Sequence, residues 1–207
     1  TAKNCKIFIP DPWVFDEPPI PEKISGFVEL PRYIAKNYTS LSKLKVAKLI
    51  FCFLKQSAHL AGVQAVVRSL TILLKGITRF GPQNFVFICF FDYLSAAAFA
   101  RCAKYENVNL SYLFLNSIAH VQHHYWHSPD ILQLKEIIFT FKTVERILCL
   151  IDNVLGLFSN DNPMIVCNAL SQINTRKELP WVLYRIKNMD NLLGRMAIRF
   201  SRVETLM

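Results

Sequence analysis

The sequence has no aspartate or glutamate between Leu30 and Phe91. Nine basic side chains lie in the same segment, and their number equals the excess of the chain's 24 lysines and arginines over its 15 acidic residues. The net charge of +9 therefore comes from one region, because the rest of the chain is neutral in sum. The nine residues are Arg32, Lys36, Lys43, Lys45, Lys48, Lys55, Arg68, Lys75 and Arg79.

Several motifs of well-known reactions are also missing. The sequence has no GxGxxG or P-loop motif, which argues against the usual nucleotide phosphate loops, and no GxSxG, which argues against a hydrolase nucleophile elbow. Its six cysteines form no CxxC pair, so neither a zinc knuckle nor a redox dithiol is expected. The cysteines lie mostly in apolar runs and favour buried free thiols in a reducing compartment. We therefore expect a cytoplasmic protein that can also associate with a membrane.

The chain also has few charges and no long uninterrupted apolar run. Hydrophobic residues make up 52% of the 207 residues and charged residues 19%, which is typical of a folded domain with a sizeable core. The longest apolar stretches, Leu49–Leu54 and Asn84–Ala100, are interrupted by Lys55 and Asp92, so no transmembrane helix is expected. No signal peptide is expected, and the start at Thr1 rather than Met predicts a trimmed or partial chain.

Residues 1–31 are expected to form one short strand and a connector. The strand is Cys5–Ile9. Six prolines follow it, together with five acidic residues. Because proline fixes φ and has no backbone donor, this stretch favours an extended segment over the protein surface.

Residues 32–107 are expected to form a basic helical cap. Leu44, Ala47, Phe51 and Leu54 recur at helical spacing, which predicts an apolar stripe that faces the core. A second helix is expected over about 58–75 and, after the break at Gly81-Pro82, a third over about 84–105. The cap's surplus of positive charge favours contact with anionic lipid or a polyanionic substrate. The plainer alternative is a solvated basic face, and nucleic acid is disfavoured because no recognised module is present.

Residues 108–207 are expected to form an α/β core. A strand signal over 110–115 is followed by a helix over about 128–158 that begins at Ser128-Pro129-Asp130, and then by a strand over 164–167. A further strand is expected over 181–184. A strand–helix–strand unit predicts a parallel sheet covered by helices, with the helical cap as an insertion.

The most informative feature of this core is a run of imidazoles directly after its first strand. Four of the chain's five histidines lie within eight residues: His120, His123, His124 and His127. On a helical turn they would share one face, and His120, His123 and His124 could ligate a divalent metal such as zinc or manganese. The alternative is that some of them pack against Tyr125 and Trp126 or bond to the backbone. Carboxylates that would complete a hard-metal site are absent nearby.

Polar residues at the expected strand ends are candidates for substrate contact. Asn116 and Asn168 end the two neighbouring strands, and Ser171 and Gln172 lie in the loop that follows the second one. Together with Trp126 they are expected to line a binding crevice, since ligands bind at the carboxyl ends of such strands. The alternative for the asparagines is an ordinary role in turns.

The order of these elements resembles the metal-binding core of the alkaline phosphatase superfamily. The resemblance rests on a strand, Asn116-x-x-x-His120, a long helix, and a strand ending in Asn168-Ala169. The most similar branch is the type I phosphodiesterase/nucleotide pyrophosphatase group. Residues 9–13 before a helical insertion, and residues 120–126, also look like uncharacterised bacterial members. The resemblance covers about residues 5–185, but its specific parts are only about 116–126 and 164–172.

The resemblance implies a phosphoester site with departures. Members of the group hold two divalent metals through Asp-x-x-x-His and Asp-His-Gly, beside a Thr or Ser nucleophile. Here Asn116 replaces an aspartate ligand, Asn168-Ala169 replaces Asp-His, and only His120 carries over. The strand that would hold the first aspartate and the nucleophile is not in this chain. The resemblance therefore implies a rebuilt site, lost catalysis or a portion of a larger enzyme.

Two functions follow as expectations. The first is a hydrolase or transferase, or a portion of one, that acts on a phosphate or sulfate ester, free or linked to lipid or glycan. In it His124, Asn116 and Asn168 would be catalytic, beside the metal ligands named above. The second is a catalytically degenerate binding or scaffold protein that uses its basic helical surface to engage an anionic partner or a membrane.

Overall fold

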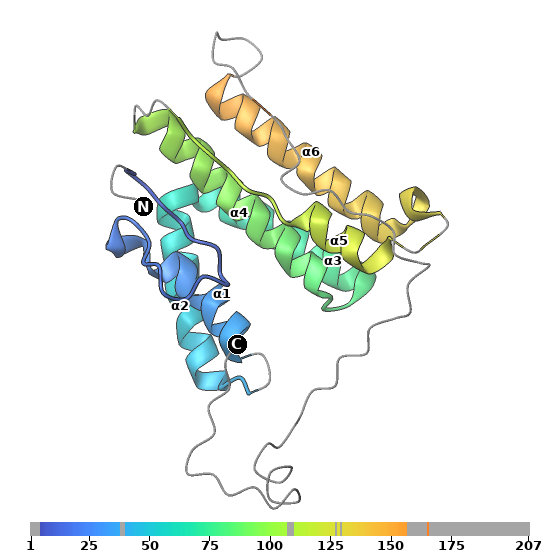
Figure 1. Cartoon of the computed structure of the whole chain (residues 1–207), viewed down its shortest axis with the longest axis horizontal. Helices are drawn as coiled ribbons and strands as arrows, with labels where there is room; N and C mark the ends of the chain where they lie inside the picture. Colours follow the sequence, from blue (N-terminus) through green and yellow to red (C-terminus); the bar gives the residue numbers. More distant parts are fainter. Residues whose placement is uncertain are drawn as a thin grey trace, which may run out of the picture. The chain divides into compact units, whose positions relative to one another are not determined.

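The computed structural model describes residues 5–37, 40–106, 110–126, 128, 130–156 and 165. They all belong to Thr1–Ser171, the first of the two units into which the chain divides. This part contains six α-helices and two short 3-10 turns, and none of its residues lies in a β-strand (Figure 1). The predicted α/β fold with a parallel sheet is therefore wrong for the described part of the chain, which is a helical assembly.

The strand predicted over 110–115 is an irregular segment that lies along α4 (Asn84–Tyr105) in Figure 1. Leu113 and Leu115 of this segment pack on the core, while Leu110, Tyr112 and Phe114 stay exposed. A strand, however, needs a neighbouring strand for its backbone groups, and a helix surface offers none. The segment therefore packs its buried leucines against helices without forming a strand.

The strand predicted at Cys5–Ile9 is also wrong, apart from one isolated antiparallel bridge between Phe8 and Ile20. The Phe8 N–H donates to Ile20 O at 2.8 Å and the Ile20 N–H returns a bond at 2.9 Å. The strands predicted over 164–167 and 181–184 lie outside the described residues, apart from Ile165.

The connector predicted up to residue 31 ends earlier than expected. A 3-10 turn, η2 (Glu22–Ile24), leads directly into helix α1 (Gly26–Asn37), which contains Pro31. Phe27 and Val28 of this helix are buried in one cluster with side chains of α2 and α4. Burial of an apolar face stabilises most protein helices, and here it outweighs the poor helix propensity of proline.

Helices α2 (Lys43–Ala61) and α3 (Val63–Phe80) meet at Gly62, whose φ of +91° favours glycine. The stripe predicted to bury α2 is wrong, because Leu44 is 84% exposed and Phe51 is 70% exposed. The buried face consists of Phe53, Ser57 and Leu60. The helix has apolar residues on two faces, and its packing against α1, α3 and α4 covers only one of them.

Helix α4 (Asn84–Tyr105) has the bounds expected from the sequence and packs against α2, α3, α5 and α6. Its small residues Ala96, Ala97, Ala98 and Ala100 are all buried and let neighbouring helices approach closely. Contrary to expectation, α4 is long and apolar enough to cross a membrane by length and composition. More than half of it is buried among the other helices, as in the core helix of a globular domain.

The last two helices are α5 (Ser117–Tyr125) and α6 (Lys135–Leu155). The helix start predicted at Ser128-Pro129-Asp130 is wrong: a 3-10 turn, η3 (Ile131–Gln133), comes first, and extended Leu134 separates it from α6. Within α6, Ile137 and Ile151 are buried. Phe141 and Leu148 are exposed, whereas Thr140 and Thr143 are buried in the same helix. Their hydroxyls donate to carbonyls one turn earlier, which allows that burial.

Candidate functional site

Helix α5 begins at a buried carboxylate of α4. Oδ2 of Asp92 accepts the backbone N–H of Asn116 at 3.0 Å and that of Ser117 at 2.8 Å. Asp92 is only 4% exposed, so these bonds are shielded from water. The first amides of a helix have no partner within it, and a carboxylate there also interacts favourably with the helix dipole. Asp92 therefore fixes the beginning of α5 to the middle of α4.

Burial dominates the electrostatics of this carboxylate. It raises the pKa of Asp92 to about 6 from the ordinary 3.8, against the lowering effects of the Ser117 N–H, the Ser117 side chain and the Asn116 N–H. The sequence pattern did not assign a role to Asp92. The available signal was that it is the first acidic residue after a long acid-free segment and lies inside an apolar helix.

The opposite anchor of α5 is apolar. Val121 is fully buried in a cluster with Phe85 and Val86 of α4 and Ile137 of α6. Tyr125 packs at the edge of this cluster, where burial and then Glu136 raise the pKa of its phenol. Helix α5 is thereby held between α4 and α6. The other residues of α5 therefore keep fixed positions relative to these two helices.

Two of the predicted histidines meet on this helix. The rings of His120 and His124 lie 4.8 Å apart between centroids at an interplanar angle of 61°. His120 is half-buried, and burial, followed by His124 and His123, lowers its pKa below the ordinary 6.5. His120 is thus predominantly neutral at pH 7, with an unprotonated ring nitrogen that can accept a proton or bind a metal. We call His120 and His124 the histidine pair.

The other histidines of the run do not add a third ligand in the described residues. His123 and His124 are exposed, whereas His127 lies outside the described residues. No group of three His, Cys, Asp or Glu side chains that could hold a metal occurs in the described ranges. The zinc or manganese site predicted at His120, His123 and His124 stays a prediction.

Asn116 and Trp126 stand at the two ends of α5. The Asn116 carbonyl accepts the N–H of His120 at 3.0 Å, and the Trp126 N–H donates to Gln122 O at 2.9 Å. The backbone groups of both residues therefore take part in the hydrogen bonding of α5. Neither side chain has a hydrogen bond within the described part. Ser117 is fully buried, which keeps its hydroxyl from acting as a nucleophile here. The predicted Asn168, Ser171 and Gln172 lie outside the described residues.

The chain has no significant match among family models, curated proteins or solved structures. Its function must therefore be argued from its own residues. The resemblance to the alkaline phosphatase superfamily stays an inference from sequence motifs, and relatives neither support nor oppose it.

Proposed function

We propose that the histidine pair is the polar centre of a site for a phosphate or sulfate ester, in an alkaline phosphatase-like hydrolase or transferase or a portion of one. The observation that carries this proposal is the contact of a half-buried, neutral His120 with His124 on a helix whose start is fixed by Asp92. A fixed helix start positions both imidazoles, and catalytic groups act best when their geometry is set in advance.

The amides at the start of α5 limit how such a substrate could bind. Helix N-termini often bind phosphate through free N–H groups. In this helix the amides of Asn116 and Ser117 already donate to Asp92. The negative charge of an ester would therefore be met by the imidazoles, or by a cation that they hold, and not by these two amides.

A divalent ion fits the donor set only in part. Zinc in catalytic sites takes three protein ligands, and the histidine pair offers two at i, i+4 spacing. The third ligand expected from the sequence is His123, which is exposed next to His124. A bound ion would supply Lewis-acid stabilisation of the ester oxygens. The asparagines Asn116 and Asn168 would orient the substrate.

Metal titration with single variants tests this proposal. We expect the wild-type protein to bind one Zn²⁺ or Mn²⁺ per chain by calorimetry, and His120→Ala and His124→Ala to lose at least about tenfold in affinity. His59→Ala is the matched control, since His59 is an exposed histidine on α2. The same proteins would be assayed with chromogenic phosphate and sulfate esters. Equal metal affinity in all four proteins, with no ester turnover, would contradict the proposal.

A non-catalytic binding protein is the second candidate. It is favoured by the acid-free helices α2 and α3, whose positive charges have no acidic residue in the same segment. The two candidates differ in what the histidine pair does, because a binding protein that uses α2 and α3 would keep its affinity for its partner in His120→Ala and His124→Ala.

A further inference from the structure

Helix α2 presents apolar and basic side chains together on its outer face. Leu44, Lys48, Phe51 and Lys55 follow one another at i, i+4, i+7 and i+11, so they form one ridge. All four are exposed, on the side of α2 away from its buried Phe53. Two large apolar side chains thus alternate with two lysines on a surface that no described residue covers.

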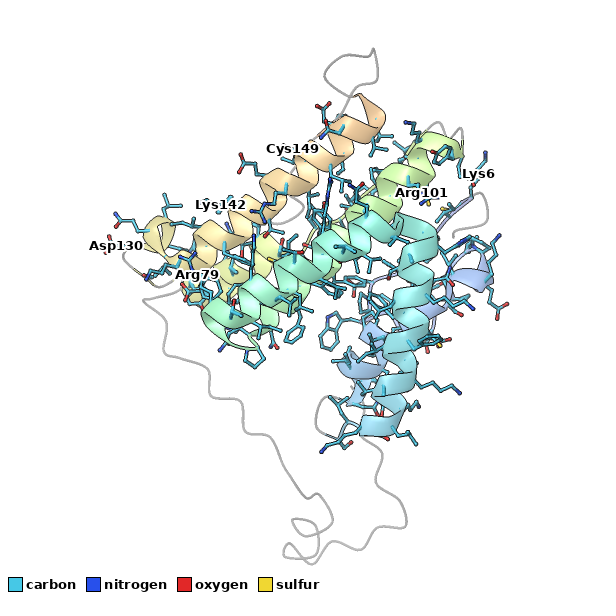
Figure 2. The ribbon with its side chains drawn as sticks, turned by 180° about the vertical axis from the view of Figure 1, so that it is seen from behind. Lys6, Arg79, Arg101, Asp130, Lys142 and Cys149 are labelled. Atoms are coloured by element: carbon cyan, nitrogen blue, oxygen red, sulfur yellow. The ribbon has the colours of Figure 1, made fainter. Side chains whose placement is uncertain are left out.

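Helix α3 repeats this arrangement. Val63, Val67 and Leu74 are each more than half exposed and lie along one edge of its outer face. Along the other edge are Arg68, Lys75 and Arg79, all exposed. Figure 2 shows α2 and α3 on the side turned towards the reader, with Arg79 at the far end of α3. The two helices also pack against each other.

The middle of the α3 face is less polar than its sequence suggests. Thr71 Oγ1 donates to Val67 O at 2.9 Å, and Thr78 Oγ1 donates to Lys75 O at 3.1 Å. Both hydroxyl donors are therefore engaged within the helix itself. The desolvation free energy of such a face is lower than that of a face with free hydroxyl groups.

Four of the positive charges on this surface are unpaired within the described part of the chain. Lys48, Lys55, Arg68 and Lys75 make no ion pair or hydrogen bond there through their charged groups. By contrast, Lys36 and Lys45 lie over the rings of Phe15 and Tyr33. Four cations without such contacts thus lie on the outer faces of α2 and α3, while Arg79 of the same surface lies over the ring of Phe80, 5.4 Å from its centroid.

We propose that the outer surface of α2 and α3 binds a lipid bilayer rich in anionic phospholipids. It consists of Leu44, Lys48, Phe51, Lys55, Val63, Val67, Arg68, Leu74, Lys75 and Arg79. The apolar side chains enter the boundary between headgroups and acyl chains, while the long basic side chains reach the lipid phosphates. Both components are needed, since neither a few exposed apolar residues nor a few charges alone anchor a protein stably.

The chemistry of this surface favours a bilayer over other anionic partners. A nucleic acid would engage the cations but leave the aliphatic residues beside water, and Phe51 is the surface's only aromatic residue for base stacking. An acidic protein partner requires directional polar contacts, whereas the two threonine donors of this face are already used. A bilayer boundary matches alternating aliphatic and cationic side chains without such contacts.

Vesicle flotation of the full chain tests the proposal. We expect at least about tenfold stronger binding to vesicles of phosphatidylcholine with about 30% phosphatidylserine than to phosphatidylcholine alone, and weaker binding at higher salt. The charge variant Lys48→Gln/Lys55→Gln and the apolar variant Leu44→Ser/Phe51→Ser should each lower binding by about tenfold. All four positions are exposed, so folding is expected to persist and is checked by circular dichroism.

Matched controls come from α6. Lys142→Gln and Phe141→Ser change an exposed lysine and an exposed phenylalanine of that helix, and we expect both to leave vesicle binding unchanged. Equal binding to neutral and anionic vesicles would overturn the proposal. Unchanged vesicle binding in the two α2 variants would also overturn it. The same holds if these variants lose binding only to a soluble polyanion such as heparin and still bind vesicles. The result does not depend on the histidine pair, since His120→Ala should bind vesicles as the wild type does.

Discussion

Gly76 of α3 lies so close to Val86 of α4 that a Cβ atom built on the glycine would stand 2.3 Å from Val86 Cγ1. Val86 is fully buried and β-branched, so its side chain has little freedom to move away. The contact between α3 and α4 thus depends on the absence of a side chain at one position. It is one of the most extensive contacts of α4.

Gly76→Ala should destabilise the protein by about 1–3 kcal/mol, as overpacking of a core does, although alanine has the higher helix propensity. Urea unfolding measures the difference. Adding Val86→Ala should recover part of the loss of the glycine variant, because it removes the atom that clashes. Gly26→Ala is the control, since its added Cβ would have 3.4 Å to the nearest atom. A stabilised Gly76→Ala protein would show that the two helices can separate freely.

Asp92 should make stability depend on pH in the acid range. Its pKa is about 6 in the folded protein against 3.8 as the ordinary value, so the folded state binds the proton more tightly. The contribution of this bound proton to the free energy of unfolding is fully present below about pH 4. It is lost as the pH rises through about 6, with an amplitude of about 3 kcal/mol. The difference in unfolding free energy between wild type and Asp92→Asn, measured between pH 4 and 8, reports it.

The two neutral replacements of Asp92 should behave differently. Asparagine keeps an oxygen that can accept the N–H of Ser117 and avoids the cost of a buried charge, so Asp92→Asn should be at least as stable as wild type at pH 7.5. Alanine leaves both amides without an acceptor, at a cost of about 1–3 kcal/mol for each buried donor. If both variants were equally stable, the bonds to Asn116 and Ser117 would have no energetic role.

Phe51 and Phe53 are two residues apart but on different faces of α2. Phe53 is 2% exposed and its ring stacks on Phe27 at 5.4 Å between centroids. Phe53→Ala should cost about 3–5 kcal/mol, whereas Phe51→Ala should stay within about 0.5 kcal/mol. Thermal or urea unfolding of the two variants measures this contrast. Similar losses at both positions would mean that Phe51 is covered in solution.

Cys89 should resist thiol reagents in the folded protein. Burial raises the pKa of its thiol to about 12, chiefly by removing water from around it. The thiolate, which is the reactive form, is then scarce at neutral pH. Cys149 is exposed and serves as the internal reference. Peptide mass spectrometry after alkylation should find Cys149 modified at once, and Cys89 only after denaturant is added.

Three helices between residues 43 and 105 could be predicted from the sequence, and Gly81-Pro82 indicated the break before α4. The second one was expected over about 58–75, whereas α2 continues to Ala61 and α3 spans Val63–Phe80. Gly62 and Gly81 both have positive φ and follow α2 and α3 directly. Their orientation was harder to predict. Helix α2 has apolar residues on two faces, and periodicity alone did not distinguish the face with Phe53 from the face with Phe51.

The fold class was wrong because a short, largely apolar segment was interpreted as a strand. Whether residues 110–115 pair in a sheet depends on a partner elsewhere in the chain, which a local pattern cannot specify. In the candidate site, the contact of His120 with His124 follows from helical spacing, as expected. The hydrogen bond from the Ser117 N–H to the Asp92 carboxylate joins residues 25 positions apart and could not be inferred from either one.

The position of α4 in the chain has a consequence for synthesis on the ribosome. Helices α2 and α3 emerge before α4, yet α4 is the surface on which Phe53, Leu60 and Ile72 become buried. Until residue 105 has left the exit tunnel, the apolar inner faces of both helices lack their partner. A nascent chain in this interval exposes hydrophobic surface that chaperones recognise, so ribosome-bound intermediates that end before α4 should bind them most strongly.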